Sequence, residues 1–275
     1  MAQPLVQIGG HRDDFAATER TDAWWVGPTL TAAGLILFFG YLTVRAMQGT
    51  YVWHEPYISP TVAPPLFTPA EGYPGAVPVE HAWLGAFPAW WPSFLPQSPA
   101  FFFPGLAILF RATCYYYRKA YYRAFGMSPP GCSVRASKRK YEGETAILLF
   151  QNLHRYAFYG ALFLLVCLWY EAIASFFKDG EFGIGVGSVV MTLNATFLGG
   201  YTFGCHSFRH LIGGRSDCMT CDRAPTTKFK LWSFSTWFNG RHMQFAWISL
   251  VWVVFTDLYI YLVSSGAITD LNTWS

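Results

Sequence analysis

The sequence predicts an all-α integral membrane protein, a bundle of about five transmembrane helices with a long outer loop rich in proline and aromatic residues. Hydrophobic residues make up 53% of the 275 residues and charged residues only 13%. A soluble domain carries roughly 25% charged residues. Aromatic residues reach 19%, an enrichment typical of chains that place rings at both membrane interfaces. The net charge of +3 is too small to indicate a nucleic-acid-binding protein.

Five apolar stretches are long enough for membrane helices, which need about 20 mostly apolar residues. They cover residues 25–47, 101–122, 153–177, 184–212 and 243–264. The second stretch is the weakest because Arg111 interrupts it, and Asn239 with Gly240 predicts a helix break before the fifth. Residues 1–24 mix acidic and basic residues without a short apolar core, so we expect a tail and not a cleavable signal peptide. Residues 25–275 are then a single five-helix membrane domain.

The Lys and Arg residues orient this bundle, because such residues are enriched in cytoplasmic loops. The outer loop, residues 50–99, has no Lys or Arg but holds eleven of the 17 prolines and four of the 12 tryptophans. We predict that it forms an irregular cap on the outer face. Basic residues crowd residues 118–145 and 209–230, which we predict to be cytoplasmic loops. With five spans across the cell inner (plasma) membrane, we expect the N-terminus in the cytoplasm and the C-terminus outside.

Candidate metal ligands gather at the cytoplasmic end of this predicted bundle. Cys218 and Cys221 form a C-x-x-C pair, whose two thiolates can reach one metal ion from a tight turn. His206 and His210 are spaced i,i+4 and share one helix face, and His242 begins the fifth span. The two thiols with the imidazoles of His206 and His210 make a Cys2His2 set. A disulfide between Cys218 and Cys221 is not expected, because the cytoplasm is reducing.

The remaining cysteines receive no ligand role from the sequence. Cys114 and Cys167 fall within predicted spans and are expected to pack in the core, as free cysteines usually do. Cys205, beside Gly204, is interpreted as a small packing residue. Cys132 is assigned no role.

The ligand types leave more than one metal open. Zinc accepts two thiolates and two imidazoles in a tetrahedral site. A Rieske-type [2Fe–2S] centre uses the same four ligands, with two Cys on one iron and two His on the other, although the spacing differs from the usual Rieske boxes. Haem is a third option, with axial imidazoles drawn from His154, His206, His210 and His242, but it leaves the C-x-x-C pair unexplained.

Aromatic rings and hydrogen-bond donors at the same membrane edge predict a quinone pocket, in which rings pack the flat head group and donors bind its carbonyls. The candidate contacts are Arg155, Tyr156, Trp232, Trp237, Arg241 and Gln244. Arg111 lies deeper, where a charged residue is a functional hypothesis by default. Toward the other face, Arg45, Glu171 and Asp257 either pair or lie at the interface, and we favour the interface.

The five spans, the outer loop, the C-x-x-C pair and the surrounding histidines resemble the membrane anchor of a type F succinate dehydrogenase. This is a branch of respiratory complex II, a succinate:quinone oxidoreductase. The resemblance implies a flavoprotein subunit and an iron–sulfur subunit on the cytoplasmic face, and electron transfer from them to a membrane quinone, with menaquinone expected. It also implies a Rieske-type [2Fe–2S] cluster in place of haem. Carried onto this chain, Cys218 and Cys221 would hold one iron, and two of His206, His210 and His242 the other.

Two other functions are kept open by the sequence. One is a zinc-stapled membrane scaffold that recruits a partner through its basic loops, and the other is a transporter with Arg111 in the substrate path. Succinate chemistry needs a flavin, and the chain shows no flavin-binding pattern. An enzymatic role would therefore be that of the quinone-reducing part of a larger complex.

Overall fold

The fold is taken from a computed structural model, which describes residues 16–69, 72–137, 148–214, 218–221 and 226–274. Most of the predicted tail at residues 1–24 lies outside these ranges. Parts of the two predicted basic loops, residues 138–145 and residues 215–217 and 222–225, lie outside them as well.

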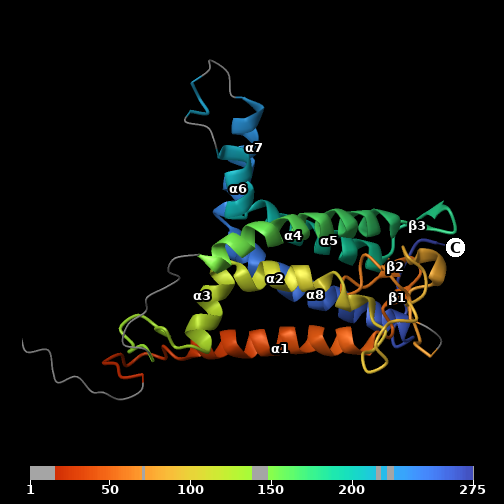
Figure 1. The fold of residues 1–275 in the computed structure, drawn as a ribbon, viewed down its shortest axis with the longest axis horizontal. Coiled ribbons are helices and arrows are strands. Elements are labelled where there is room, and N and C mark those ends of the chain that lie inside the picture. The colour runs from red at the N-terminus through yellow and green to blue at the C-terminus, as the bar shows by residue number, and fades with distance from the viewer. Residues whose placement is uncertain (1–15, 70–71, 138–147, 215–217, 222–225, 275) are drawn as a thin grey trace, which may run out of the picture.

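Three helices in the described part of the chain are long and apolar enough to cross a membrane. They are α1 (Val26–Gln48), α4 (Leu149–Ala174) and α8 (His242–Ser264), which correspond to the first, third and fifth predicted spans. Figure 1 shows them running along one common direction, with α1 at the edge of the bundle. An all-α membrane bundle is therefore supported, but only three of its five expected spans are uninterrupted helices of full length.

The second and fourth predicted spans are each broken into two helices. The second consists of α2 (Pro104–Thr113) and α3 (Tyr115–Ala124), separated by the extended residue Cys114. The fourth consists of α5 (Val186–Phe203) and α6 (His206–Gly213), separated by Gly204 and the extended residue Cys205. Over 18 residues α5 is about 27 Å long at 1.5 Å per residue, just short of a roughly 30 Å hydrocarbon core. It packs between α4 and α8 as a member of the bundle.

The glycine at the end of α5 has a steric reason. A Cβ atom on Gly204 would lie 2.9 Å from the backbone oxygen of Phe238, so only glycine lets the end of α5 approach α7 (Thr227–Asn239) this closely. Asn239 donates a hydrogen bond from Nδ2 to the Gly204 carbonyl at 2.7 Å, and Ser235 donates from Oγ to the Phe203 carbonyl at 2.8 Å. These bonds satisfy carbonyls that the end of α5 leaves free.

Helices α6 and α7 pack against each other and form the arm, which projects away from the bundle across the direction of α4, α5 and α8 (Figure 1). Arg209 of α6 donates to Asn239 Oδ1 at 3.1 Å, and its guanidinium lies 5.0 Å from the centre of the Trp232 ring of α7. The end of the bundle that carries this arm and α3 is called the arm end below.

Residues 50–99 form the cap at the opposite end of the bundle. They contain a two-stranded hairpin of β1 (Trp53–His54) and β2 (Tyr57–Ile58), with antiparallel register Trp53 to Ile58, and two short 3-10 turns at Val79–His81 and Pro99–Phe101. A second hairpin, β3 (Phe177–Lys178) and β4 (Glu181–Phe182), joins α4 to α5 at the same end. Apolar cap residues pack on the bundle around Ala172, Ala195 and Ile260.

A buried ion pair fastens the cap to the bundle. Arg45 of α1 donates from Nε to Asp257 of α8 at 2.8 Å, and both side chains are buried. The cap hydroxyls of Ser59 and Thr61 bind the other oxygen of the same carboxylate. The expectation that Arg45 and Asp257 lie at the interface without pairing was therefore wrong, because the cap covers them and a buried charge requires a partner.

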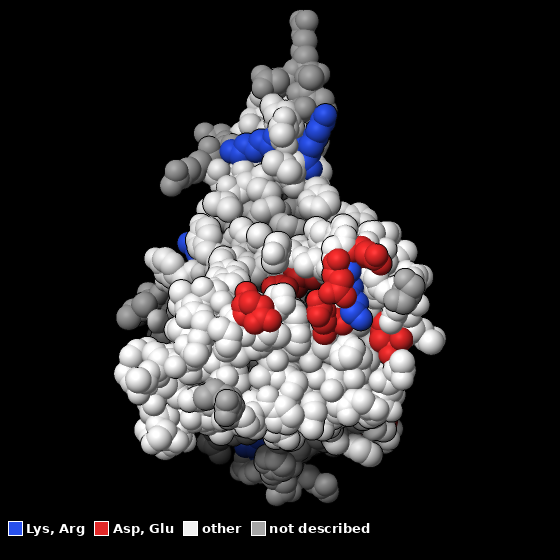
Figure 2. Space-filling model, turned by 90° about the vertical axis from the view of Figure 1, so that its right-hand side faces the viewer, with Lys and Arg blue, Asp and Glu red and all other residues white. Residues whose placement is uncertain are grey.

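The two ends of the bundle differ in charge. Figure 2 looks onto the cap end, where exposed acidic side chains gather; the exposed acids of the cap and the β3–β4 hairpin are Glu55, Glu80, Asp179 and Glu181. The described basic residues of α3 and the arm lie at the other end. The first described residues lie beside α3, whereas the C-terminus lies beside the cap (Figure 1).

Candidate functional site

The arm end holds a cavity of about 730 Å³, called the site cavity below. It lies where the junction of α2 and α3, the start of α4, the junction of α5 and α6, and the start of α8 meet. Its sulfur- and imidazole-bearing residues are Cys114, His154, Cys205, His206, His210 and His242.

Each broken helix places a buried cysteine at its break. Cys114 is the N-cap of α3 and Cys205 is the N-cap of α6, and both have extended backbone. The Cys205 Sγ accepts a hydrogen bond from the backbone N–H of Ser207 at 3.3 Å. N–H groups at a helix start have no partner within the helix and favour negative charge. The break at Cys205 therefore offers a hydrogen-bond donor to a thiolate that binds metal.

Two histidines from unbroken helices face these cysteines. The Nε2 atom of His154, on α4, lies 3.1 Å from Cys205 Sγ, and the Nε2 atom of His242, at the start of α8, lies 3.8 Å from Cys114 Sγ. The other ring nitrogen of His154 is 2.9 Å from Thr113 Oγ1. A hydrogen bond at the second nitrogen is the usual way in which a metal-binding imidazole is oriented.

Aromatic rings fix the planes of both imidazoles. His154 stacks on Phe110 with ring centres 4.7 Å apart, and His242 stacks on Tyr201 at 4.9 Å. The Tyr201 hydroxyl and the Nδ1 atom of His242 are buried and have no hydrogen-bond partner within the described ranges. Such unpartnered polar atoms are costly, and they are common next to a group that binds in the cavity.

The four side chains supply the ligand types of a two-iron cluster and are not arranged around a single metal ion. Among the residues that the structure describes, no three or more His, Cys, Asp or Glu side chains are arranged to hold one ion. A tetrahedral zinc site needs four ligands around one point. A [2Fe–2S] cluster needs only two protein ligands at each iron, and the Rieske type takes two Cys and two His. Cys114, Cys205, His154 and His242 supply this set.

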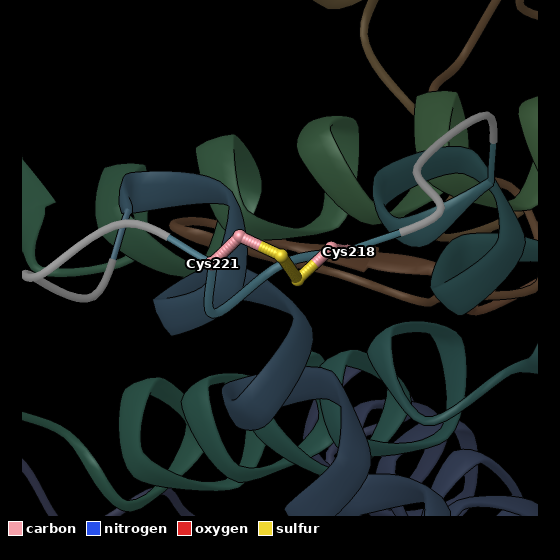
Figure 3. Close-up of a disulfide and its surroundings, with 2 residues drawn as sticks. All are labelled: Cys218 and Cys221. Carbon is pink, nitrogen blue, oxygen red and sulfur yellow. A yellow bond between two sulfur atoms is a disulfide. The ribbon is translucent and has the colours of Figure 1, made fainter.

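The C-x-x-C pair lies elsewhere. Cys218 and Cys221 are joined by a disulfide in the segment between α6 and α7 (Figure 3), and both are exposed. Their Cα atoms are 5.8 Å apart, well inside the range that a disulfide spans. Neither residue lines the site cavity. The prediction that these two cysteines would not be joined was wrong: three-residue spacing in a turn brings the two sulfur atoms within bonding distance of each other.

The other predicted ligands are divided between two positions. His206 and His210, on one face of α6, line the site cavity but are exposed at its mouth. His242 is buried deep inside it. Cys114 and Cys205, interpreted from the sequence as packing residues, are instead the buried thiols that the histidines face. Cys167 is buried in α4 and does not line the cavity.

The predicted quinone contacts are also split. Arg155 and Trp232 line the site cavity, whereas Tyr156, Trp237, Arg241 and Gln244 are exposed on the surface of the helices. The Arg241 guanidinium lies over the Trp237 ring at 4.1 Å and donates to the Trp237 carbonyl at 3.2 Å. These residues therefore do not form one pocket.

Comparison with known proteins gives one family and one solved structure. Residues 26–266 match the family described as actinobacterial succinate dehydrogenase subunit SdhC. The chain is similar to a chain of the solved structure "Mycobacterium smegmatis Sdh1 complex in the apo form", with 39% identity, 94% of each chain covered and a TM-score of 0.81. No curated protein matches the sequence.

Proposed function

The chain belongs to the family of actinobacterial succinate dehydrogenase subunit SdhC, and we propose that it carries electrons from the soluble part of the complex to a membrane quinone. It is the membrane subunit of a succinate dehydrogenase complex, an oxidoreductase with further subunits. One observation carries the electron-transfer proposal. Two buried cysteines at helix breaks, the buried His242 and the partly buried His154 converge in one cavity at one end of the bundle.

In this proposal, Cys114 and Cys205 hold one iron of a Rieske-type [2Fe–2S] cluster, and His154 and His242 hold the other. When bound, such a cluster accepts and donates single electrons, which zinc cannot do because it has no redox chemistry. The protein's own contribution is positional. Thr113 orients His154, and the rings of Phe110 and Tyr201 hold the two imidazoles and help to exclude water. No haem is proposed.

The ligand set expected from the sequence is the competing version of the same proposal. It uses Cys218 and Cys221 with two of His206, His210 and His242. It would require the disulfide to be reduced and the thiols to move to the cavity. The set of Cys114 and Cys205 requires neither change, so we favour it.

The arm end is proposed to face the cytoplasm and to bind the iron–sulfur subunit, with the flavoprotein subunit beyond it. Lys and Arg mark the cytoplasmic side of a membrane protein, and the described basic residues of this end include Arg118, Arg209, Lys228 and Lys230. The acidic cap end would then face outward from the plasma membrane (Figure 2). The quinone is proposed to be menaquinone, as the family resemblance implies.

Metal analysis and EPR of the whole purified complex test this proposal. We expect more iron and acid-labile sulfide than the soluble clusters account for. After reduction of the complex, we expect the EPR signal of an imidazole-ligated cluster. Cys114→Ser and Cys205→Ser should each abolish that signal while leaving the soluble clusters intact. Cys167→Ser, which changes a buried cysteine away from the cavity, is the matched control and should keep it.

Three outcomes would overturn parts of the proposal. One zinc and no additional iron would favour the scaffold. Loss of the signal in Cys218→Ser, with retention in Cys114→Ser and Cys205→Ser, would restore the ligand set expected from the sequence. A haem absorption band would replace the cluster while keeping the electron-transfer role.

A further inference from the structure

A basic pocket of about 240 Å³, called the α3 pocket below, lies on α3 at the arm end of the bundle. One wall consists of two tyrosines and three cations of α3, and the other wall is Ser128 with Pro129. The α3 side chains are Tyr115, Arg118, Lys119, Tyr122 and Arg123. Every charged residue in this described lining is a cation. A hollow lined by one sign of charge concentrates the field and attracts an anion.

The spacing of these side chains divides α3 into two faces. Positions 115, 118, 119, 122 and 123 follow the i, i+3, i+4, i+7, i+8 pattern of one helix face. On the other side of the helix Tyr117 is buried, and Tyr116 and Tyr121 pack against the core of the bundle. Helix α3 is therefore amphipathic, with rings toward the bundle and cations away from it.

The second wall of the pocket is held on α3 by a tight fold of the chain. Ser128 donates its backbone N–H and its hydroxyl to the Tyr122 carbonyl, at 3.3 and 3.1 Å. A Cβ atom on Gly126 would lie 2.8 Å from the same carbonyl oxygen, so glycine is required for this close approach. The backbone as well as the side chains therefore builds the pocket.

The α3 pocket lies beside the start of α1. The segment that follows α3 bonds to the tail that precedes α1: Thr18 Oγ1 donates to the Ser133 carbonyl at 2.7 Å, and the Arg135 N–H donates to the Ala17 carbonyl at 3.0 Å. The first turns of α1 expose large apolar residues, namely Trp25, Val26 and Leu30. In a membrane these apolar residues face lipid, so the pocket lies at the level of the lipid head groups.

Two of the three cations have no acidic partner within the part of the chain that the structure describes. The ion pairs there join Arg20 to Asp22 and Arg45 to Asp257, and neither includes Lys119 or Arg123. Their charges are thus available to an anion from outside the chain. Basic pockets beside membrane helices on the cytoplasmic side are typical binding sites for anionic lipid head groups.

We propose that the α3 pocket binds the head group of an anionic phospholipid, with Lys119 and Arg123 contacting its phosphate. The tyrosine rings suit this position because such rings prefer the membrane interface, and the acyl chains would lie along the exposed apolar residues of α1. A soluble partner subunit also fits a cationic surface. Figure 1 shows α3 running toward α1 at the edge of the bundle, whereas the arm projects from the opposite side, which favours lipid. The inference goes beyond the proposed function and does not depend on the occupant of the site cavity.

The test is a titration of the whole purified complex in detergent with phosphatidylglycerol, followed by native mass spectrometry. The variant Lys119→Gln, Arg123→Gln removes both charges, and Lys119→Arg, Arg123→Lys keeps them. Lys228→Gln with Lys230→Gln removes the same charge from α7 of the arm and is the matched control. Titrations with phosphatidylcholine, and competition with inorganic phosphate, separate an anionic lipid from a neutral lipid and from a free anion. The subunits present in each complex are counted in the same spectra.

We expect the glutamine variant of α3 to bind phosphatidylglycerol about 30-fold more weakly than the wild type, the effect of losing two cations at an anionic membrane surface. The charge-conserving variant and the arm control should bind it as the wild type does. Unchanged affinity in the glutamine variant, or equal affinity of the wild type for phosphatidylcholine, would overturn the inference. Displacement of the lipid by inorganic phosphate would assign the pocket to a free anion. Loss of soluble subunits from the glutamine variant with unchanged lipid binding would identify a protein-docking surface instead.

Discussion

Replacing Asp257 with alanine removes the acceptor that ties the cap to α8. The carboxylate is fully buried. It accepts four hydrogen bonds, from Arg45 Nε at 2.8 Å, Tyr41 Oη at 2.7 Å, Ser59 Oγ at 2.5 Å and Thr61 Oγ1 at 3.2 Å. Without it, the guanidinium of Arg45, a residue only 4% exposed, loses its charged partner.

The size of the effect follows from this burial. Removing one partner of a buried ion pair costs about 3–5 kcal/mol, because the other charge stays buried. Arg45 would keep Gln48 Oε1 and the Thr50 carbonyl as neutral acceptors, at 3.2 and 3.0 Å. We therefore expect the lower end of the range, about 3 kcal/mol. At about 2–4 °C per kcal/mol for a domain near this size, the melting temperature should fall by roughly 10 °C.

Thermal unfolding of the purified complex in lipid nanodiscs measures this shift. Glu55→Ala, which removes an exposed carboxylate of the cap, is the control and should melt with the wild type. The double variant Arg45→Met, Asp257→Leu should recover most of the loss, since a pair of apolar side chains often replaces a buried ion pair without cost. A fall of less than about 2 °C in Asp257→Ala, below 1 kcal/mol on the same scale, would refute the reasoning. A double variant no more stable than Asp257→Ala would show that the stranded Arg45 charge is not the cause.

Two further predictions concern the cap and the disulfide of the arm. Tyr57→Phe removes the hydrogen bond from Tyr57 Oη to Asp270 at 2.6 Å and should cost about 1–3 kcal/mol of unfolding free energy, measured by thermal melting. Burial and this bond raise the pKa of Tyr57 above its usual value, so the stabilisation is complete below about pH 10 and declines as the pH rises further. The difference in unfolding free energy between the wild type and the variant should then become smaller in strong alkali. A difference that does not depend on pH would contradict this reasoning. Cys218→Ser with Cys221→Ser should leave succinate:quinone activity and the membrane cluster signal at the wild-type level, and loss of either would contradict the assignment of Cys114 and Cys205.

The sequence predicted the continuous helices well, because a long apolar run determines a membrane helix almost without tertiary information. It predicted the breaks poorly. Cys114 stands in a stretch with no proline or glycine from Leu106 to Phe125, so nothing local predicts that α2 ends at Thr113. At the second break the sequence has Gly204 beside Cys205, and glycine is required there because Phe238 of another helix approaches closely.

The sequence analysis did not predict that these four residues of the site cavity, Cys114, His154, Cys205 and His242, lie together, because the helix breaks were not predicted. The C-x-x-C pair attracts attention because its two thiols are close in sequence, whereas the four proposed ligands are brought together from four separate segments. His154, Cys205 and His242 were each predicted at the cytoplasmic end of a span. Cys114 was not, because a second span drawn over residues 101–122 puts it deep in the membrane. Once α2 ends at Thr113, Cys114 moves to the same level as the other three.

The two helix breaks and the two stacked rings lie at the same end of the bundle and make that end chemically different from the other. A continuous helix at Cys114 or Cys205 would use its N–H groups in its own hydrogen bonds and offer none to a thiolate, whereas a break creates a new helix start at the sulfur. The guanidinium of Arg111, three residues before Cys114, lies 5.0 Å from the centre of the Tyr201 ring, on which His242 also stacks. In the proposed function, electrons enter at the arm end and leave the site cavity toward the membrane quinone. Because Tyr201 contacts both His242 and Arg111, Tyr201→Leu should slow quinone reduction and leave dye reduction unchanged. An unchanged rate of quinone reduction in this variant would mean that electrons leave the site cavity by another route.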